Sequence, residues 1–355
     1  MNMSKNICIV AGARPNFVKV APLIRAIQKS GKADFVLVYA GREDDPTLED
    51  SLFEDLQMPR PDFYLGVDSV SLNEITSRVM AEFDSFLDQH VVDVVIVVDD
   101  LASTMAAAIV TKKRGIRLAH LVAGTRSFDI NMPKEINRLV IDALSDYLFT
   151  AGVKSNSVAT REQAESSQTY MVGNILMDTL RNNHDRLRRP SSLLDIREGS
   201  YIVFTLNRRA LLANKENLYR MVQTMIDNAH GMTIVAPLRE NARKELERFE
   251  NKLLVCNALS YLEFGWLIAH AKGVVTDSGN VAEEATFHGV PCITLNNYTE
   301  HQETVTVGSN VLVGEDADKL SEELKKMVSG EWKKCALPDR WDGRTADRIV
   351  QILLA

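Results

Sequence analysis

The sequence lacks several features that would place it outside ordinary globular proteins. It has no apolar run long enough to span a bilayer, no block of basic residues and no signal-peptide pattern ahead of its first apolar segment. Its net charge of -7 argues against a surface for nucleic acid or an anionic membrane, although it does not exclude a small anionic ligand. We therefore expect a cytoplasmic protein that binds neither nucleic acid nor a membrane.

Cysteine is also scarce, and its spacing excludes the usual cysteine-based sites. The chain has four cysteines, which form no CxxC pair and no metal-ligand pattern: Cys8, Cys256, Cys292 and Cys335. Three of them lie in or beside apolar runs that are typical of strands. We expect reduced cysteines, with the first three as packing residues, and no metal site.

The first half of the chain alternates short apolar runs with segments of helical periodicity. The runs predict strands near residues 5–12, 35–41, 93–98, 117–124, 147–151 and 170–173. Because helices separate them, the strands should form an open parallel sheet with helices on both faces. We assign residues 1–175 to this N-terminal Rossmann-like domain.

A second series of strands and helices follows a linker with the sequence RRPSS at residues 188–192. Apolar runs begin at Tyr201, Thr233, Leu253, Gly273, Pro291 and Asn310. The fold class is therefore α/β, with two doubly wound Rossmann-like domains and, by default, a ligand in a cleft between them. The second domain is assigned to residues 176–337, and residues 338–355 to a C-terminal helix that packs back on the first domain.

The stretch from Val274 to Gly289 carries the strongest signal for a ligand. It predicts a strand, a short polar turn and a helix N-terminus, where uncovered backbone N–H groups and the helix dipole suit a phosphate. Glu283 and Glu284 are expected in the first helical turn, where carboxylates also favour a helix without any ligand. The segment alone leaves both interpretations open.

Charged residues follow the strands of the first half as well. Arg14 and Lys19 come at or near the carboxyl end of the first strand, which is the ligand-binding edge of a doubly wound sheet, although a solvated surface pair is the alternative. Asp99 and Asp100 follow the strand DVVIVV. One of two such aspartates often caps the next helix, so only one is expected to face a ligand.

Several motifs, taken together, resemble one enzyme family. They are GARPNFVKVAPL from Gly12, AGTRSFDINMPKEINR from Ala123, VGN from Val172 and TDSGNVAEEA from Thr276, with further matches running to the WDG near the C-terminus. This order resembles the non-hydrolysing UDP-N-acetylglucosamine 2-epimerases. The resemblance implies the GT-B-like two-domain fold, a UDP-N-acetylamino sugar in the cleft, a homodimer and no metal or organic cofactor.

The reaction that this resemblance implies inverts C2 of the sugar by eliminating UDP and adding it back after protonation from the other face. The resemblance also implies that Asp100 and Glu135 are the catalytic residues. Substrate-binding roles carry over to Arg14, Lys19, Arg138, Phe264, Ser278, Gly279, Asn280 and Glu284. Among these, the phosphate turn is Ser278–Gly279, Glu284 would accept ribose hydroxyls, and Phe264 would lie beside the uracil.

The chain departs from the family pattern where proton transfer is expected. Val122 replaces the glutamate of an HxEAG strand end, Lys134 replaces the first of two glutamates, and Asn207 replaces a histidine. Neither valine nor an amide titrates near neutral pH. Ionisable groups appear instead at Asp99 and Glu43.

Three functions remain open from the sequence. The first is an active UDP-N-acetylamino sugar 2-epimerase that supplies cell-surface polysaccharide precursors. The second is a nucleotide-sugar-binding protein or regulatory subunit that has lost catalysis. The third is changed chemistry, such as hydrolysis or transfer of a nucleotide sugar, with Asp99, Glu43 or Lys134.

Overall fold

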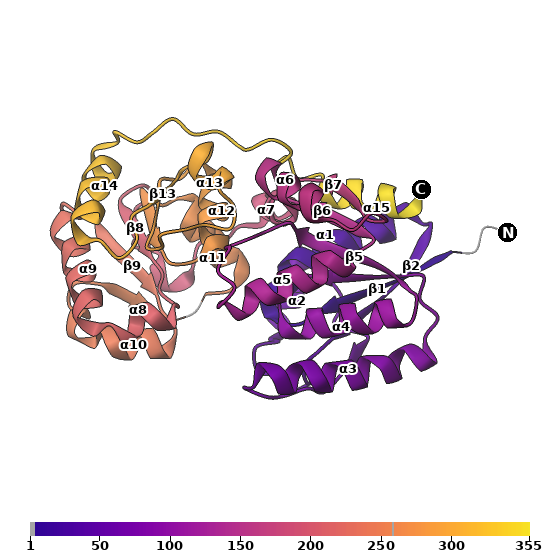
Figure 1. The fold of residues 1–355 in the computed structure, drawn as a ribbon. Coiled ribbons are helices and arrows are strands. Elements are labelled where there is room, and N and C mark those ends of the chain that lie inside the picture. Colours follow the sequence, from indigo (N-terminus) through magenta and orange to yellow (C-terminus); the bar gives the residue numbers. More distant parts are fainter. Residues whose placement is uncertain (1–3, 258) are drawn as a thin grey trace. The chain divides into compact units, whose positions relative to one another are not determined.

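The computed structural model describes residues 4–257 and 259–355. They fall into two compact units, one comprising the chain up to Asn182 with Asp339–Ala355, and the other Asn183–Pro338 (Figure 1). The first unit thus extends past residue 175, because helix α7 (Ile175–Asn183) lies almost wholly within it.

The first unit is built on a parallel sheet of seven strands in the order β3-β2-β1-β4-β5-β6-β7. The strands are β1 (Lys5–Ala11), β2 (Ala33–Tyr39), β3 (Phe63–Tyr64), β4 (Val94–Val98), β5 (Arg117–Ala123), β6 (Tyr147–Thr150) and β7 (Gln168–Met171). The order reverses between β1 and β4, which pair directly. This switch point brings the turn after β1 and the two aspartates after β4 to one edge of the sheet.

Helices cover both faces of this sheet, which explains why the central strands β1 and β4 are largely apolar without alternation. They are α1 (Arg14–Ser30), α2 (Asp50–Leu56), α3 (Leu72–Gln89), α4 (Ala102–Lys113), α5 (Pro133–Leu144), α6 (Val153–Glu162), α7 and α15 (Thr345–Leu354). Cys8 and Val10 of β1 pack with residues of α3 and α4, while Ile7 and Ile9 are equally buried on the opposite face. A strand buried on both faces reads as a continuous apolar run.

The C-terminal segment belongs to the first unit, where α15 lies against α1 (Figure 1). The Asp178 carboxylate accepts the backbone N–H groups of Thr345 and Ala346 at 3.1 and 2.8 Å and so caps this helix. Burial raises the pKa of Asp178 to about 6. Trp341, which precedes the helix, is fully buried and donates its indole N–H to the Ala151 carbonyl.

The second unit has a parallel sheet of six strands in the order β10-β9-β8-β11-β12-β13. The strands are β8 (Tyr201–Phe204), β9 (Thr233–Pro237), β10 (Leu254–Cys256), β11 (Gly273–Thr276), β12 (Cys292–Thr294) and β13 (Asn310–Leu312). The helices are η1 (His184–Arg186), η2 (Ser191–Leu193), α8 (Arg209–Ala213), α9 (Lys215–Asn228), α10 (Glu240–Leu246), η3 (Glu247–Phe249), α11 (Tyr261–Ala269), α12 (Gly279–His288), α13 (Glu303–Thr306) and α14 (Ala317–Ser329). Two buried clusters, one on each face of the sheet, form its core.

Both units are therefore Rossmann-like, as the alternation of strands and helices predicts. Within the described part of the chain, no helix is both long and apolar enough to cross a membrane.

Candidate active site

Asp99 follows β4 at the switch point of the first sheet and has a left-handed backbone conformation, with φ of 61°. Its carboxylate accepts hydrogen bonds from Lys19 Nζ at 2.5 Å and from Asn16 Nδ2 at 2.7 Å. The Asn16 side-chain oxygen in turn accepts the backbone N–H groups of Gly12 and Ala13. Lys19, which is 7% exposed, thus joins α1 to the loop after β4.

The expectation that one aspartate caps the following helix is wrong. Helix α4 begins at Ala102 with Leu101 as its N-cap residue, and no side chain caps it. Thr104 Oγ1 accepts the Leu101 N–H instead. The carboxylate of Asp99 is directed to Lys19, and that of Asp100 to cations of α5, so neither is free to turn back onto α4.

Asp100 is buried and bound by two cations of α5. Arg138 donates from Nε at 2.8 Å and from Nη2 at 2.6 Å to one carboxylate oxygen, and Lys134 Nζ lies 3.2 Å from the other. Burial raises the pKa of Asp100, but the charges of Lys134 and Arg138 outweigh it and hold the pKa below the ordinary value. Asp100 is therefore an ionised carboxylate at neutral pH.

Glu135 is the second carboxylate at this edge and is 2% exposed. It accepts the backbone N–H groups of Ser127 and Phe128 at 2.8 and 3.0 Å, the Ser127 hydroxyl at 2.9 Å and Arg138 Nη1 at 3.0 Å. Burial raises its pKa, and these donors together lower it below the ordinary value. One guanidinium thus joins Asp100 to Glu135, and both carboxylates are anions.

A buried charge network behind this edge was missed from the sequence. His120 Nδ1 lies 2.6 Å from the Asp142 carboxylate, and its Nε2 lies 2.9 Å from the Asp99 carbonyl oxygen. Arg126 binds the other oxygen of Asp142 at 2.7 Å. Burial raises the pKa of Asp142, but His120 and Arg126 outweigh burial and hold this pKa below its ordinary value. A histidine inside an apolar strand was the one available signal, because such a group needs a buried partner.

Val122 occupies a strained position at the end of β5. Its φ is 76°, and the pairing of β5 with β6 shifts register between Leu121 and Ala123. A β-branched residue in this conformation is an outlier, because its Cβ crowds the following carbonyl. The backbone is therefore held in a shape that its side chain does not favour.

In the second unit, the turn between β11 and α12 has the open N-terminus that the sequence predicts. Ser278 is the N-cap residue of α12, its side chain makes no capping hydrogen bond, and Gly279 and Asn280 are exposed. A Cβ added to Gly279 would meet no atom within 4 Å. The first backbone N–H groups of this helix therefore face open space, where an anion can approach them.

The turn is held in place by Asp277, which is 9% exposed. Its carboxylate accepts the backbone N–H groups of Asn207 at 2.7 Å and Arg208 at 2.5 Å, and Asn296 Nδ2 donates to its carbonyl oxygen. Burial raises the pKa of Asp277 above its ordinary value, against these hydrogen bonds. Asn207 thus lies beside the anion-facing turn through its backbone, while its side chain is exposed.

Glu283 and Glu284 are not in the first turn of α12, because the helix begins at Gly279 and they fall in its second turn. Both are buried. Glu283 pairs with His301 Nε2 at 2.9 Å. Burial, with the neighbouring Glu283 charge, raises the pKa of Glu284 to about 8. These carboxylates therefore act as buried polar groups and not as partners of the helix dipole.

Arg14 and Phe264, the two predicted residues not yet described, lie in the first and the second unit respectively. Arg14 is the first residue of α1 and is half-buried. Phe264 is a half-buried residue of α11, which packs against α12. Of the predicted site residues, the first unit contains Arg14, Lys19, Asp100, Glu135 and Arg138, and the second contains Phe264, Ser278, Gly279, Asn280 and Glu284. No cluster of three or more His, Cys, Asp or Glu side chains suited to a metal occurs among residues 4–257 and 259–355.

These features define an α/β protein with two doubly wound domains of the GT-B-like type. The family model for UDP-N-acetylglucosamine 2-epimerase matches residues 25–354. The chain therefore belongs to the UDP-N-acetylglucosamine 2-epimerase family, as the motifs predict.

Curated relatives and solved structures agree with this family. The UDP-N-acetylglucosamine 2-epimerase of Methanocaldococcus jannaschii is 33% identical, over 97% of this chain and 98% of its own length. The UDP-2,3-diacetamido-2,3-dideoxy-D-glucuronate 2-epimerase of Pseudomonas aeruginosa is 32% identical, over 90% and 91% of the two chains. The crystal structure of the M. jannaschii enzyme in complex with UDP-GlcNAc and UDP is similar with a TM-score of 0.86, 32% identity and coverage of 98% and 99%.

Proposed function

We propose that this protein inverts C2 of a UDP-N-acetylamino sugar by eliminating UDP and adding it back. Family membership supports the reaction class, and the solved M. jannaschii relative contains UDP-GlcNAc and UDP. The observation that carries the proposal is the pair of ionised carboxylates, Asp100 and Glu135, joined by Arg138 at the switch point of the first sheet. A base there is already deprotonated at neutral pH.

The nucleotide is assigned to the second unit. The backbone at Ser278, Gly279 and Asn280 supplies N–H donors at the positive end of α12, which suits the diphosphate. Glu284 lies one turn further along this helix, so its carboxylate is assigned to the ribose hydroxyls. Phe264 supplies an aromatic face for the uracil.

The sugar chemistry is assigned to the first unit. Asp100 or Glu135 takes the proton from C2, and the electrons of the C2–H bond form a double bond between C1 and C2. The C1–O bond breaks, and UDP leaves with the electron pair of that bond. The first proton then passes from the carboxyl group to solvent, a proton that originates from water is added to the other face of the alkene at C2, and UDP adds back to C1. Arg14 and Lys19 are assigned to the substrate as cations that offset negative charge on the departing group. The protein needs no metal or organic cofactor in this scheme.

The substitutions at the first unit limit the expected rate. Lys134 places a second cation on Asp100, which makes the carboxylate a weaker base, and Val122 provides no titratable group. Asn207 likewise carries no proton donor that titrates near neutral pH. We therefore expect turnover that is slow for this reaction class. We also propose that the protein is cytoplasmic and forms a homodimer.

The proposal is tested by incubating the protein with UDP-GlcNAc and separating the C2 epimers by chromatography. We expect the C2 epimer to accumulate toward equilibrium, and Asp100→Asn or Glu135→Gln to slow it by roughly 10²-fold or more. Asp129→Asn, which changes an exposed aspartate of the neighbouring loop, is the matched control and should retain the rate. Tight UDP binding without any epimer would contradict the proposed reaction.

A further inference from the structure

The ring of His120 on β5 has an acceptor at each of its two nitrogens. Nδ1 lies 2.6 Å from the Asp142 carboxylate, and Nε2 lies 2.9 Å from the Asp99 carbonyl oxygen. A neutral imidazole carries one N–H, so one of its nitrogens would direct a lone pair at an oxygen lone pair. Both contacts are hydrogen bonds only when both nitrogens carry a proton. The contacts therefore indicate an imidazolium, in a side chain that is 1% exposed.

The carboxylate of Asp142 favours the same state of the ring. It is ionised, because it also accepts the Gly124 N–H at 3.1 Å and lies 2.7 Å from Arg126, so it has no proton to offer His120. Arg126 is shared with Glu162 of α6, from which its Nη2 lies 2.9 Å away. An imidazolium at His120 supplies a second cation to a carboxylate that is 6% exposed, and a buried charge needs such partners.

The hydrogen bond from His120 fixes one of the two peptide groups that flank Asp100. The Asp99 carbonyl belongs to the peptide group that joins Asp99 to Asp100, and Asp99 has a left-handed conformation. The carbonyl of Asp100 accepts Asn137 Nδ2 at 2.9 Å, which fixes the peptide group that follows. With both peptide planes held, the Cα–Cβ bond of Asp100 has a fixed direction, and its carboxylate contacts Arg138. The orientation of this carboxylate thus depends on His120.

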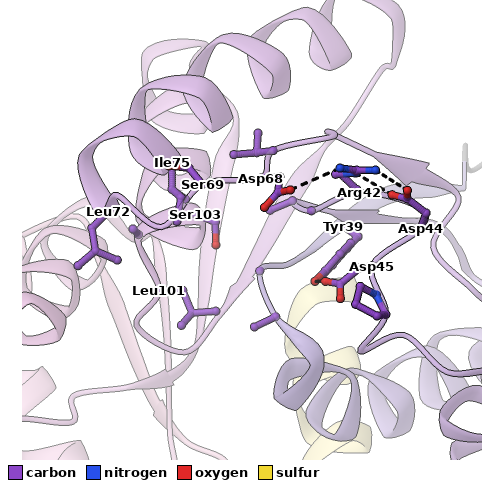
Figure 2. A pocket seen from close by; sticks show the side chains of 17 residues that line it. Tyr39, Arg42, Asp44, Asp45, Asp68, Ser69, Leu72, Ile75, Leu101 and Ser103 are labelled. Carbon is purple, nitrogen blue, oxygen red and sulfur yellow. Dashed lines mark hydrogen bonds and ion pairs between the residues drawn. The ribbon is translucent and has the colours of Figure 1, made fainter. Parts of the chain in front are cut away.

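On another side, the loop that carries Asp100 borders open space. Leu101, which follows Asp100 in the chain, is partly buried and lines a cavity of about 450 Å³ (Figure 2). Packing on the cavity side therefore contributes little to the shape of the loop. The ion pair between Lys19 and Asp99 holds the carboxylate of Asp99 and not its carbonyl group. The carbonyl depends on His120 instead.

We propose that His120 is a positioning residue for Asp100, held as an imidazolium that fixes the peptide group between Asp99 and Asp100. Because its ring is buried, it acts through Asp100 and not on the sugar itself. The role in catalysis rests on the proposed function, in which Asp100 acts at C2. The protonation of the ring and the orientation of the peptide group do not depend on that function.

The protonation of His120 is tested by NMR on the full chain labelled with 15N-histidine at pH 7. We expect both ring nitrogens of His120 to carry a proton. Among the seven histidines, His120 is identified by ring N–H protons that exchange slowly with water, because it is buried, and by loss of its signals on replacement. A His120 ring with one bare nitrogen would overturn the inference.

Two amide variants separate the two hydrogen bonds of the ring. His120→Gln places its amide nitrogen near the position of Nε2, where it can donate to the Asp99 carbonyl. His120→Asn places its amide nitrogen near Nδ1, where it can donate only to Asp142. Both variants lose the imidazolium charge, so their difference reports the bond to Asp99. We expect kcat for C2-epimer formation to fall roughly 10²-fold in His120→Asn and severalfold in His120→Gln, with KM nearly unchanged, because a misplacement of about 1 Å has this effect.

Crystal structures of the two variants test the peptide group without any turnover. We expect the peptide group between Asp99 and Asp100 to keep its orientation in His120→Gln and to rotate in His120→Asn. His90→Gln is the matched control, because His90 is partly buried at the end of α3 and its Nδ1 lies 2.8 Å from the Phe86 carbonyl oxygen. This control should retain kcat, and UDP affinity should be the same in all three variants.

Two further results would contradict the positioning role. One is an Asp99–Asp100 peptide group that keeps its orientation in His120→Asn, and the other is an equal kcat in the two His120 variants of a protein that forms the C2 epimer. Failure of the proposed function is a different result, because the parent then forms no C2 epimer. The nitrogen signals and the crystal structures still decide the inference in that case.

Discussion

Lys134 Nζ lies 3.2 Å from one oxygen of the Asp100 carboxylate, and Arg138 Nη2 lies 2.6 Å from the other. Asp100 is 8% exposed, so it is shared between two cations in a largely desolvated place. An anion stabilised in this way binds a proton weakly. The contact between these two residues therefore sets the basicity of the carboxylate that we assign to C2.

Replacing Lys134 by glutamine should speed epimerisation severalfold. The change removes one of the two charges that lower the pKa of Asp100, so that the pKa rises toward its ordinary value and the carboxylate becomes a stronger base. The initial rate of C2-epimer formation from UDP-GlcNAc measures this. Lys325→Gln, which removes an exposed lysine of α14, is the control. A loss of rate as large as that of Asp100→Asn would show instead that the ammonium group carries a proton in the reaction.

UDP affinity should rise with pH through about 8, because the ionised Glu284 accepts ribose hydroxyls better than the neutral carboxyl does. Calorimetry between pH 6 and 9 on the parent and Glu284→Gln measures this, and we expect the Gln variant to bind weakly with little pH dependence. Glu322→Gln, on the exposed face of α14, is the control for general charge effects. An unchanged pH profile in Glu284→Gln would exclude Glu284 from the ribose site.

The raised pKa of Glu284 also predicts how the stability of the folded protein depends on pH. The folded-state pKa of Glu284 is raised to about 8 from the ordinary 4.5, so between these values the unfolded chain has lost a proton that the folded chain still binds. Its contribution to stability therefore falls as pH rises from 4.5 to 8. Glu284→Gln should accordingly gain melting temperature relative to the parent as pH increases across this window. An equal difference at pH 5 and pH 8 would contradict the raised pKa.

Gly279→Val should abolish most UDP binding while leaving the fold intact. A Cβ at this position meets no atom of the protein within 4 Å, so only an approaching ligand would be obstructed. We expect a loss of at least roughly tenfold in UDP affinity by calorimetry, with a melting temperature close to that of the parent. Unchanged UDP affinity would place the diphosphate elsewhere.

Lys19→Ala is the informative contrast to that variant. It removes the cationic partner of the half-buried Asp99 and leaves only the Asn16 amide, so it should destabilise the protein by about 3 kcal/mol while weakening UDP binding less than Gly279→Val does. Urea unfolding and UDP calorimetry on the two variants separate these effects. A stable Lys19→Ala protein that no longer binds UDP would reverse the assignment.

Val122→Gly should be more stable than Val122→Ala by about 1 kcal/mol. Glycine adopts the φ of 76° without strain because it has no Cβ, whereas the Cβ of alanine crowds the following carbonyl. Both variants lose the valine side chain, so their difference isolates the backbone conformation. Urea unfolding measures it. The usual order, with alanine the more stable, would show that the left-handed conformation is not retained in solution.

The sequence predicted most of the strands and the open turn after β11, because both follow from local patterns. The runs from Ile7 to Ala11 and from Val94 to Val98 are apolar throughout, as expected for parallel strands that are buried on both faces. The open turn at Ser278 and Gly279 follows from small polar residues between a strand and a helix.

Side-chain pairing was not predictable in the same way. Lys19 and Asp99 are 80 positions apart, and His120 and Asp142 are 22 apart, so no local pattern reports their contacts. Asp99 does not cap the helix after β4, because its carboxylate binds Lys19, which is distant in the sequence. The raised pKa of Glu284 depends on burial by the surrounding fold, which helical periodicity alone does not reveal.

The proposed C2 inversion is tested most directly by incubating the protein with UDP-GlcNAc in D2O and following the C2 proton by NMR. We predict slow loss of the C2–H signal together with appearance of the C2 epimer, because proton removal and return at C2 define the proposed reaction. Both should be lost in Asp100→Asn and retained in Asp129→Asn. A protein that binds UDP-GlcNAc but never exchanges the C2 proton would contradict the assignment of catalysis to this edge.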